Sequence, residues 1–192
     1  MPELDDSKKR KPIPIENIRQ IQNDCIEADD EARRLAALIS DTGMRLSEAA
    51  GLHIDDIMLE GEVPRLDLKP HSWRGLKTRG SQRQIPLVVA SLWAAKSVKD
   101  TNTANPYAFP KYTSTNCTNA NSASAAINKW LKPRVPEGCV VHSFRHSLRD
   151  RLKAVQCPLD VTNQIGGWMS ASVGQCYDEG YGLSNTNDWL KK

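Results

Sequence analysis

Residue types that together suit the cleavage of a phosphodiester are spread along this chain of 192 residues. Cleavage by a protein hydroxyl needs a nucleophile, positive charge beside the non-bridging oxygens, and a proton for the departing 5′-oxygen. Arginine suits the oxygens because its guanidinium offers a rigid fork of donors and keeps its charge. Lysine can release a proton to the leaving group, and a tyrosine hydroxyl can attack. The candidates, in chain order, are Arg45, Lys77, His142, Arg145, Trp168 and Tyr177.

These candidates lie in five short segments whose order and spacing form one pattern. Arg45 lies in TGMRLSEAAGL, Lys77 in LKTRGSQRQIPL, and His142 and Arg145 in HSFRH, followed by IGGWMS and GQCYDEGY. The segments resemble the catalytic domain of the tyrosine recombinases, the phage-integrase family, over residues 15–183. The resemblance implies cleavage and rejoining of DNA strands through a 3′-phosphotyrosyl intermediate, in integration or recombination by a phage or other mobile element. It also implies that neither a metal ion nor another cofactor takes part.

His142 and Arg145 are three residues apart, which puts both side chains on one face of a helix. A helix that begins near Ser143 would also direct its N-terminal amides toward the same phosphate. The H-x-x-R pattern alone is typical of many structural histidines, and its spacing from IGGW is what favours a catalytic pair. Glu48 matches the family's supporting acidic residue, which implies that it orients Arg45 or His142. An ordinary salt bridge on a helix explains Glu48 almost as well.

Trp168 departs from the commonest family pattern, in which a histidine follows the glycine at this position. The indole N–H donates a hydrogen bond but cannot take up a proton, so general-base work would fall to His142 or to water. Packing in the core and contact with the phosphate both stay open for Trp168, and an indole can do both.

Two tyrosines compete for the role of nucleophile. Tyr177 follows Trp168 by nine residues and begins YDEG, as the family's tyrosine commonly does. Tyr181 lies thirteen residues past Trp168 and is the alternative. A phenol with a pKa of about 10 is almost wholly protonated at neutral pH, so either tyrosine needs surrounding positive charge to become a nucleophile.

The apolar periodicity predicts a mainly α-helical domain. Apolar residues recur at helical spacing from residue 15 and through EARRLAALIS, where Gly43 ends the second helix. Ser47 before EAAGL is typical of an N-cap, which places Arg45 on the turn between two helices. Further helices are predicted from Val88 onward and over residues 123–131, 144–155, 159–165, 173–177 and 188–190.

One small three-stranded antiparallel sheet is predicted within residues 53–87. Apolar and polar residues alternate there, in the runs VPRLDLK and RQIPL. The alternation is broken by Glu60-Gly61 and by the polar run GLKTRGSQ, so Lys77 is expected at or beside the second turn of the sheet.

The composition favours an anionic partner and a reducing compartment. The chain has 26 lysines and arginines against 23 acidic residues, with a net charge of +3 and a pI of about 8.6. Its five cysteines are odd in number and form no C-x-x-C pair, which indicates neither a disulfide framework nor a zinc site. No apolar run approaches the roughly 20 residues of a membrane span. These features indicate an intracellular protein, and the resemblance further implies that it is DNA-associated in the cytoplasm of a bacterial host cell.

Three parts are expected: a linker over residues 1–14, the catalytic domain over 15–183 and a C-terminal helix or tail over 184–192. Family members usually carry a core-site-binding domain before the catalytic domain, and we expect this chain to lack it. Trp189 and Leu190 are apolar at the C-terminal end, so the last helix is expected to dock on a neighbouring subunit or on its own domain. The resemblance implies a double-stranded DNA attachment site as partner and a homotetramer on that DNA.

Two other functions stay open at this point. A type IB topoisomerase shares the chemistry, but the integrase-like segments disfavour it. A catalytically silent DNA-binding module would bind phosphate in the same basic cleft without turnover. Tyr177 and Lys77 argue against a silent module, and covalent trapping of DNA separates the two functions.

Overall fold

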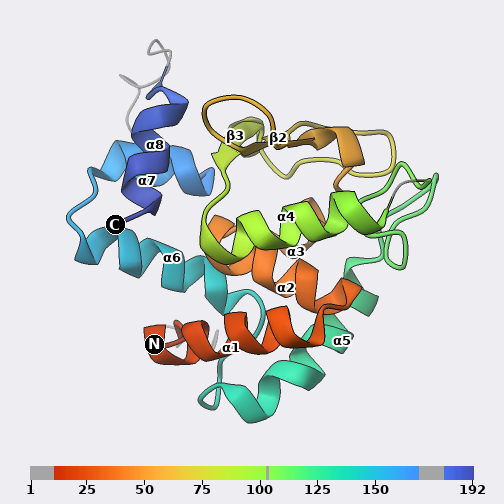
Figure 1. Ribbon diagram of the computed structural model, residues 1–192. Coiled ribbons are helices and arrows are strands. Elements are labelled where there is room, and N and C mark those ends of the chain that lie inside the picture. Colours follow the sequence, from red (N-terminus) through yellow and green to blue (C-terminus); the bar gives the residue numbers. More distant parts are fainter. Residues whose placement is uncertain (1–10, 103, 169–179) are drawn as a thin grey trace, which may run out of the picture.

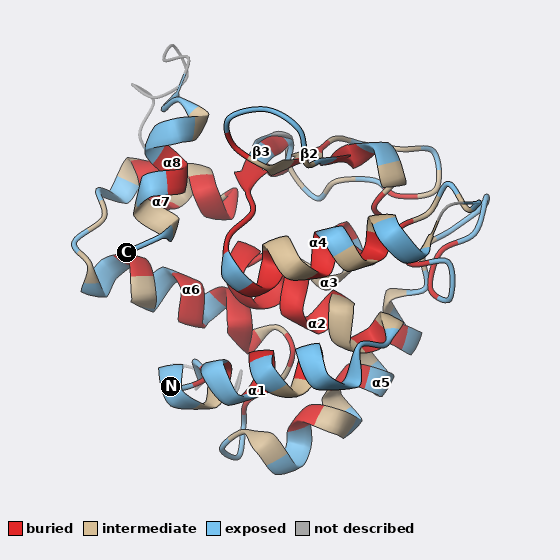
Figure 2. Cartoon of the chain, in the orientation of Figure 1, coloured by how far each residue is buried: buried red, intermediate tan, exposed pale blue. Residues whose placement is uncertain are grey.

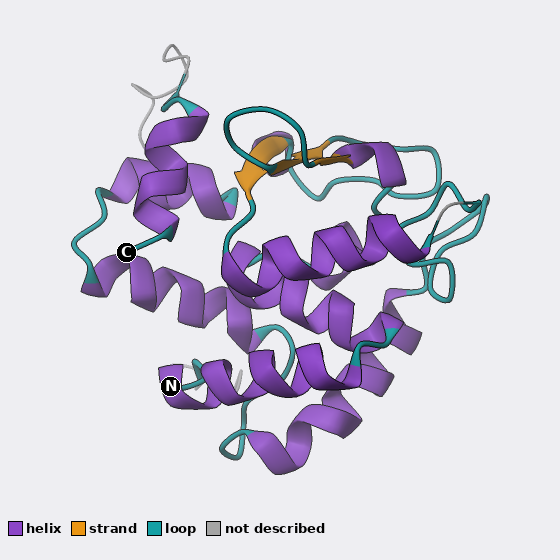
Figure 3. Cartoon of the chain, in the orientation of Figure 1, coloured by secondary structure: helices purple, strands orange, loops and turns teal. Residues whose placement is uncertain are grey.

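The computed structural model describes residues 11–102, 104–168 and 180–192, apart from the side chain of Arg79. Most of the described chain is helical, and a small sheet covers one side of the helices (Figures 1 and 3). The helices are α1 Ile15–Ala28, α2 Glu31–Thr42, α3 Leu46–Ala50, α4 Val89–Thr101, α5 Ala120–Leu131, α6 Ser143–Ala154, α7 Leu159–Gly166 and α8 Leu183–Leu190. Three short 3-10 helices are also present: η1 Ile54–Asp56, η2 Arg79–Ser81 and η3 Lys132–Arg134.

Helix α2 forms the centre of the core. It packs against α1, α4, α5 and α6, which is why Leu35, Leu38 and Ile39 are each at most 1% exposed (Figure 2). Its N-terminus is capped by the Asp30 side chain, which accepts a hydrogen bond from the Arg33 N–H. The helix ends as predicted at Gly43, whose φ of 59° lies in the left-handed region that glycine adopts without strain.

The predicted three-stranded antiparallel sheet is confirmed, with strand order β1-β2-β3. The strands are β1 Ile57–Met58, β2 Arg65–Leu68 and β3 Arg83–Pro86. Leu66 pairs with both Ile57 and Ile85, and all three side chains are fully buried. The inward-facing positions of β2 and β3 therefore turn one face of the sheet toward the helical core. The long connection from β2 to β3 carries Lys77, as expected.

The C-terminal helix docks on its own chain. A second apolar cluster contains Leu148, Leu152, Val161 and Ile165 from α6 and α7, and Trp189 and Leu190 pack against it. Helix α8 also contacts β3, and Figure 1 shows it beside α7. Of the two expected dockings, this structure contains the one in cis. The helix spans Leu183–Leu190, longer than the stretch 188–190 predicted from periodicity and close to the C-terminal helix expected within 184–192.

Two local expectations differ from the structure. Ser47 is not the N-cap of α3: Arg45 is, because the carboxylate of Glu48 already accepts the backbone N–H of Arg45 and the helix starts before Ser47. The linker predicted over residues 1–14 is not free of the domain at Ile13, which is only 3% exposed. The Ile13 N–H donates to the Ser147 hydroxyl at 2.7 Å, which ties this strip of chain to α6.

The predicted helix over residues 173–177 lies outside the described residues. Among the helices described, none combines the length and apolar character needed to cross a membrane.

Candidate active site

Arg45 and Glu48 form a pair at the start of α3. The Glu48 side chain is 1% exposed and accepts two hydrogen bonds from Arg45, one from the backbone N–H at 3.1 Å and one from Nη1 at 2.7 Å. The capping box therefore fixes the helix start and the guanidinium together. Of the two partners expected for Glu48, the structure pairs it with Arg45.

Arg83 is a member of this site that the sequence interpretation missed. Its side chain points inward from β3, where Nε donates to the Ile165 carbonyl at 3.0 Å and Nη1 donates to the Ser81 carbonyl at 2.8 Å. Its Nη2 lies 3.6 Å from the Glu48 carboxylate. Burial lowers the pKa of Arg83, the nearby Glu48 raises it, and the charge of Arg45 lowers it again. The alternation in RQIPL was the available signal, since it puts Arg83 on the same buried face as Ile85.

Arg145 completes a cluster of three guanidinium groups. Helix α6 begins at Ser143 as predicted, so Arg145 lies in its first turn, 5% exposed, and its Nη1 donates to the Gly43 carbonyl at 2.8 Å. The pKa of Arg145 is lowered to about 10, chiefly by burial and also by the charges of Arg45 and Arg83, while Glu48 opposes the shift.

We call Arg45, Arg83, Arg145 and Glu48 the arginine cluster. It holds three cationic groups against one carboxylate. Among the described residues, no acceptor binds the buried Nη2 of Arg145. A desolvated group with excess positive charge and an unpaired donor is suited to an anion.

Trp168 lies against this cluster. The Arg145 guanidinium carbon is 4.6 Å from the centre of the indole ring, and that of Arg149 is 5.6 Å away, both within cation–π range. The IGGW segment makes this contact possible: a Cβ on Gly166 would lie 1.9 Å from the Trp168 ring, and Gly167 ends α7 with a φ of 60°. Trp168 therefore packs on the catalytic candidate Arg145 rather than in an apolar core.

His142 is half-buried at the N-cap of α6, one turn before Arg145. Its ring lies 5.4 Å from that of His146 in an edge-to-face arrangement, and His146 is exposed. The position agrees with the expected helix start, and it puts His142 beside the first N–H groups of α6.

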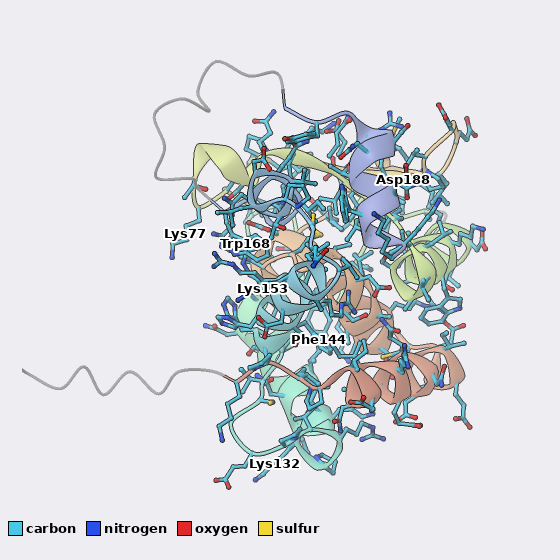
Figure 4. The ribbon with its side chains drawn as sticks, turned by 90° about the vertical axis from the view of Figure 1, so that its left-hand side faces the viewer. Lys77, Lys132, Phe144, Lys153, Trp168 and Asp188 are labelled. Atoms are coloured by element: carbon cyan, nitrogen blue, oxygen red, sulfur yellow. The ribbon has the colours of Figure 1, made fainter. Side chains whose placement is uncertain are left out.

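Lys77 is exposed on the β2–β3 connection and in Figure 4 points away from the packed body. The end of the same connection reaches the arginine cluster, because the Ser81 hydroxyl accepts a hydrogen bond from Arg45 Nη1 at 3.0 Å. The Thr78 hydroxyl lies 3.0 Å from that of Ser81. Lys77 is thus on a segment joined to the cluster, but its ammonium group is not packed into it.

Three neighbouring cations are alternatives to Lys77 in the sequence. Arg74 is 3% exposed and held on both sides by backbone carbonyls, which removes it as a mobile proton donor. Lys69 Nζ lies 3.7 Å from the buried carboxylate of Asp56. The side chain of Arg79 is outside the described part of the chain.

Of the two tyrosines, Tyr177 lies outside the described residues, so its role stays a prediction. The Tyr181 hydroxyl donates to the Asp160 carboxylate, and its backbone is bound in both directions by the Gln164 side chain. The bond from Tyr181 lowers the pKa of Asp160. For Tyr181 to attack a phosphate, these contacts with α7 would have to break.

Carboxylate pairs in the sequence have structural partners. Asp29 and Asp30 lie at the end of α1 and the N-cap of α2. Within residues 11–102, 104–168 and 180–192, no group of three or more His, Cys, Asp or Glu side chains is placed to hold a metal ion.

Comparison with solved structures defines the class of fold. XerH site-specific recombinase bound to palindromic difH substrate, a post-cleavage complex, matches with a TM-score of 0.62 at 17% identity, covering 86% of this chain and 48% of that one. The Tn1549 transposon integrase in complex with transposon right end DNA matches with a TM-score of 0.63 at 18% identity, covering 96% and 66%. XerA recombinase matches with a TM-score of 0.62 at 16% identity, covering 98% and 66%. The fold is that of the tyrosine recombinase catalytic domain.

The family follows from the sequence itself. The model of the phage integrase family matches residues 13–181, and the chain belongs to that family. It spans about half the length of the XerH chain, 48%. A search of curated proteins found no match.

Proposed function

We propose that this chain is the catalytic part of an integrase-type site-specific DNA recombinase. The Tyr177 hydroxyl attacks the scissile phosphodiester, a 3′-phosphotyrosyl bond forms, and the bond to the 5′-oxygen breaks as that oxygen takes up a proton. In the second step a 5′-hydroxyl attacks the same phosphorus, which restores the diester and returns the proton to Tyr177. Bond energy is conserved in the tyrosine ester, so ATP is not needed, and the arginines take the charge-stabilising role that a metal ion would otherwise have.

The arginine cluster carries this proposal. An attacked phosphodiester passes through a phosphorane that bears two negative charges on its non-bridging oxygens, and preorganised cations stabilise such a state. Repulsion from Arg45 and Arg83 contributes to the lowered pKa of Arg145, and an anion within reach of all three would relieve that repulsion. Glu48 leaves net positive charge in place while it fixes the orientation of Arg45.

The other candidates take the remaining tasks. Lys77 is the proposed acid for the 5′-oxygen, since arginine holds its protons too tightly. His142 exchanges the proton of the nucleophile or supports the same phosphate, and Trp168 holds the Arg145 guanidinium by stacking on it.

The comparisons support a DNA partner and a mobile-element setting. The XerH recombinase and the Tn1549 integrase were solved in complex with DNA, and the second is a transposon integrase. For the whole protein we propose a double-stranded attachment site as substrate, a homotetramer on that DNA, and a place on DNA in the bacterial cytoplasm.

Covalent trapping tests the proposal. The full-length protein is mixed with a nicked suicide duplex that carries the attachment core, in EDTA, and the adduct is read on a denaturing gel. Tyr177→Phe should abolish the adduct while DNA binding stays nearly unchanged, because only the nucleophilic oxygen is lost.

Tyr181→Phe is the matched control and should retain the adduct. An adduct that persists in Tyr177→Phe but not in Tyr181→Phe would transfer the nucleophile to Tyr181. Strict dependence on added Mg²⁺ would refute the metal-free mechanism, and DNA binding without any adduct would indicate a silent module.

A further inference from the structure

The connection that carries Lys77 contains a closed turn at residues 71–74. The backbone N–H of His71 donates to the Arg74 carbonyl at 3.0 Å, and the Arg74 N–H donates back to the His71 carbonyl at 3.1 Å. Two reciprocal bonds make this turn a rigid unit within an otherwise long connection. We call it the 71–74 turn.

The Arg74 side chain joins the 71–74 turn to α3. Its Nη1 donates to the Glu48 carbonyl at 2.7 Å, its Nη2 donates to the Lys69 carbonyl, and Nη2 lies 3.7 Å from the Asp56 carboxylate. Burial lowers the pKa of Arg74, while the charges of Asp56 and Glu48 raise it. A buried guanidinium with a nearby carboxylate and carbonyl acceptors is costly to move, because moving it strands those groups.

Trp73 adds a second attachment to the same helix end. Its indole N–H donates to the Gly51 carbonyl at 3.0 Å, and its ring stacks on His71 at 4.5 Å. His71 in turn lies 2.8 Å from the Asp56 carboxylate. Gly51 permits the close approach, since a Cβ there would lie 2.6 Å from Arg74 Cδ.

The far end of the connection is attached to the opposite end of α3. Ser81 accepts a hydrogen bond from Arg45, the N-cap of that helix. Lys77 lies three residues after Arg74 and four before Ser81. One helix of five residues, α3, therefore holds both flanks of the segment that carries Lys77.

We propose that Arg74 is a positioning residue for Lys77, acting by fixing the 71–74 turn to the helix that also carries Arg45 and Glu48. The inference rests on the proposed function, in which Lys77 protonates the leaving 5′-oxygen. An exposed lysine can meet a particular oxygen atom only if its backbone is placed accurately. The segment that carries Lys77 is short, since it is eight residues long with its two anchors, Arg74 and Ser81, included. Glu48 is common to both tasks: its carboxylate orients Arg45, and its carbonyl holds Arg74.

The first test compares two leaving groups. Arg74→Lys in the full-length protein should slow cleavage of a normal suicide duplex about 10- to 100-fold, the usual cost of misplacing a catalytic group by about 1 Å. With a 5′-bridging phosphorothiolate at the same bond, the variant should cleave close to the wild-type rate, because a thiolate leaves without a proton. An equal loss on both substrates, or no loss on either, would overturn the proposal.

Arg134→Lys is the matched control. Arg134 also binds a carboxylate and a backbone carbonyl, Asp24 and Trp130, each at 2.9 Å, but these belong to α1 and α5 rather than to the β2–β3 connection. It should lose similar bonds and cleave both substrates equally. Trp73→Phe keeps an aromatic ring and removes the N–H bond to Gly51, so it should show a smaller selective loss even if Arg74→Lys folds poorly.

Hydrogen exchange separates a failure of this inference from a failure of the proposed function, because it needs no DNA. Arg74→Lys should raise amide exchange over residues 75–82 and leave α2 and α4 unchanged, whereas Arg134→Lys should not affect residues 75–82. Unchanged exchange over 75–82 in Arg74→Lys would refute the attachment whatever the protein does to DNA. A different result would be faster exchange over 75–82 in Arg74→Lys together with no adduct from the wild type on either substrate. Arg74 would then be an anchor of the connection, and its role in catalysis would be refuted.

Discussion

An anion that enters the arginine cluster should stabilise the folded chain, and Arg145 should account for most of the effect. Folding lowers the pKa of Arg145 from the ordinary range of arginine to about 10. Each pKa unit corresponds to about 1.4 kcal/mol, so keeping this guanidinium charged at neutral pH costs up to about 3 kcal/mol, reduced by solvent screening where the side chain is partly accessible. Because the folded pKa lies below the unfolded one, the cost is present at every pH below about 10 and fades as the pH rises from about 10 toward the unfolded pKa of arginine.

Thermal unfolding in inorganic phosphate measures this effect without knowledge of the DNA sequence. At a phosphate concentration ten times its Kd, binding to the folded chain alone adds about 1.4 kcal/mol. For a chain of this length, about 2–4 °C of Tm accompanies each kcal/mol, so a rise of about 3–6 °C is expected. Sodium chloride at matched ionic strength corrects for general salt effects.

Arg145→Met should remove most of this rise. The variant loses the bond to the Gly43 carbonyl but also the repulsion from Arg45 and Arg83, so its stability without phosphate should change little. Arg134→Met is the control, because Arg134 pairs with Asp24 away from the cluster. A full phosphate effect in Arg145→Met, or an equal loss in Arg134→Met, would refute the anion site.

Two further predictions concern a proton donor and a buried thiol. Lys77→Ala should block cleavage of a normal 5′-oxygen leaving group and be rescued by a 5′-bridging phosphorothiolate. Arg145→Ala should not be rescued to the same extent. Equal rescue of the two variants would show that Lys77 is not the acid. Burial raises the pKa of Cys25 to about 12, so a thiol reagent at pH 8 should label exposed Cys117 quickly and Cys25 only after unfolding. Rapid labelling of Cys25 in the folded chain would contradict its burial.

Local patterns predicted those parts of the fold that local physics decides. The left-handed turn at Gly43, the start of α6 at Ser143 and the alternation through β2 and β3 all follow from residues within a few positions of each other. The same holds for the pairing of Arg45 with Glu48, since residues three apart meet on a helix. The segments that carry most of the candidate site could therefore be identified before their arrangement was known.

What could not be predicted depends on contacts between distant segments. Arg83 becomes a site residue only because β3 meets the end of α7, where the Ile165 carbonyl accepts its Nε across 82 positions. No pattern within RQIPL alone predicts the contact of Arg83 with Ile165. The start of α3, by contrast, is a local feature that was predicted wrongly. Ser47 has the propensity of an N-cap, but the Glu48 carboxylate accepts the backbone N–H of Arg45, and Arg45 is the N-cap.

Backbone carbonyls of other elements hold the like charges of the arginine cluster in place. Each of Arg83 and Arg145 binds a backbone carbonyl of another element through one nitrogen, Ile165 and Gly43 respectively, while another nitrogen of each is left without a hydrogen-bond acceptor among the described residues. The carbonyls fix the direction of each guanidinium but carry no full charge, so they cannot neutralise it. Glu48 neutralises one charge of three. The remaining repulsion is a cost that the apolar core offsets, and an anion among the guanidinium groups would remove it. Relief of this kind is what stabilises a transition state that carries more negative charge than its ground state.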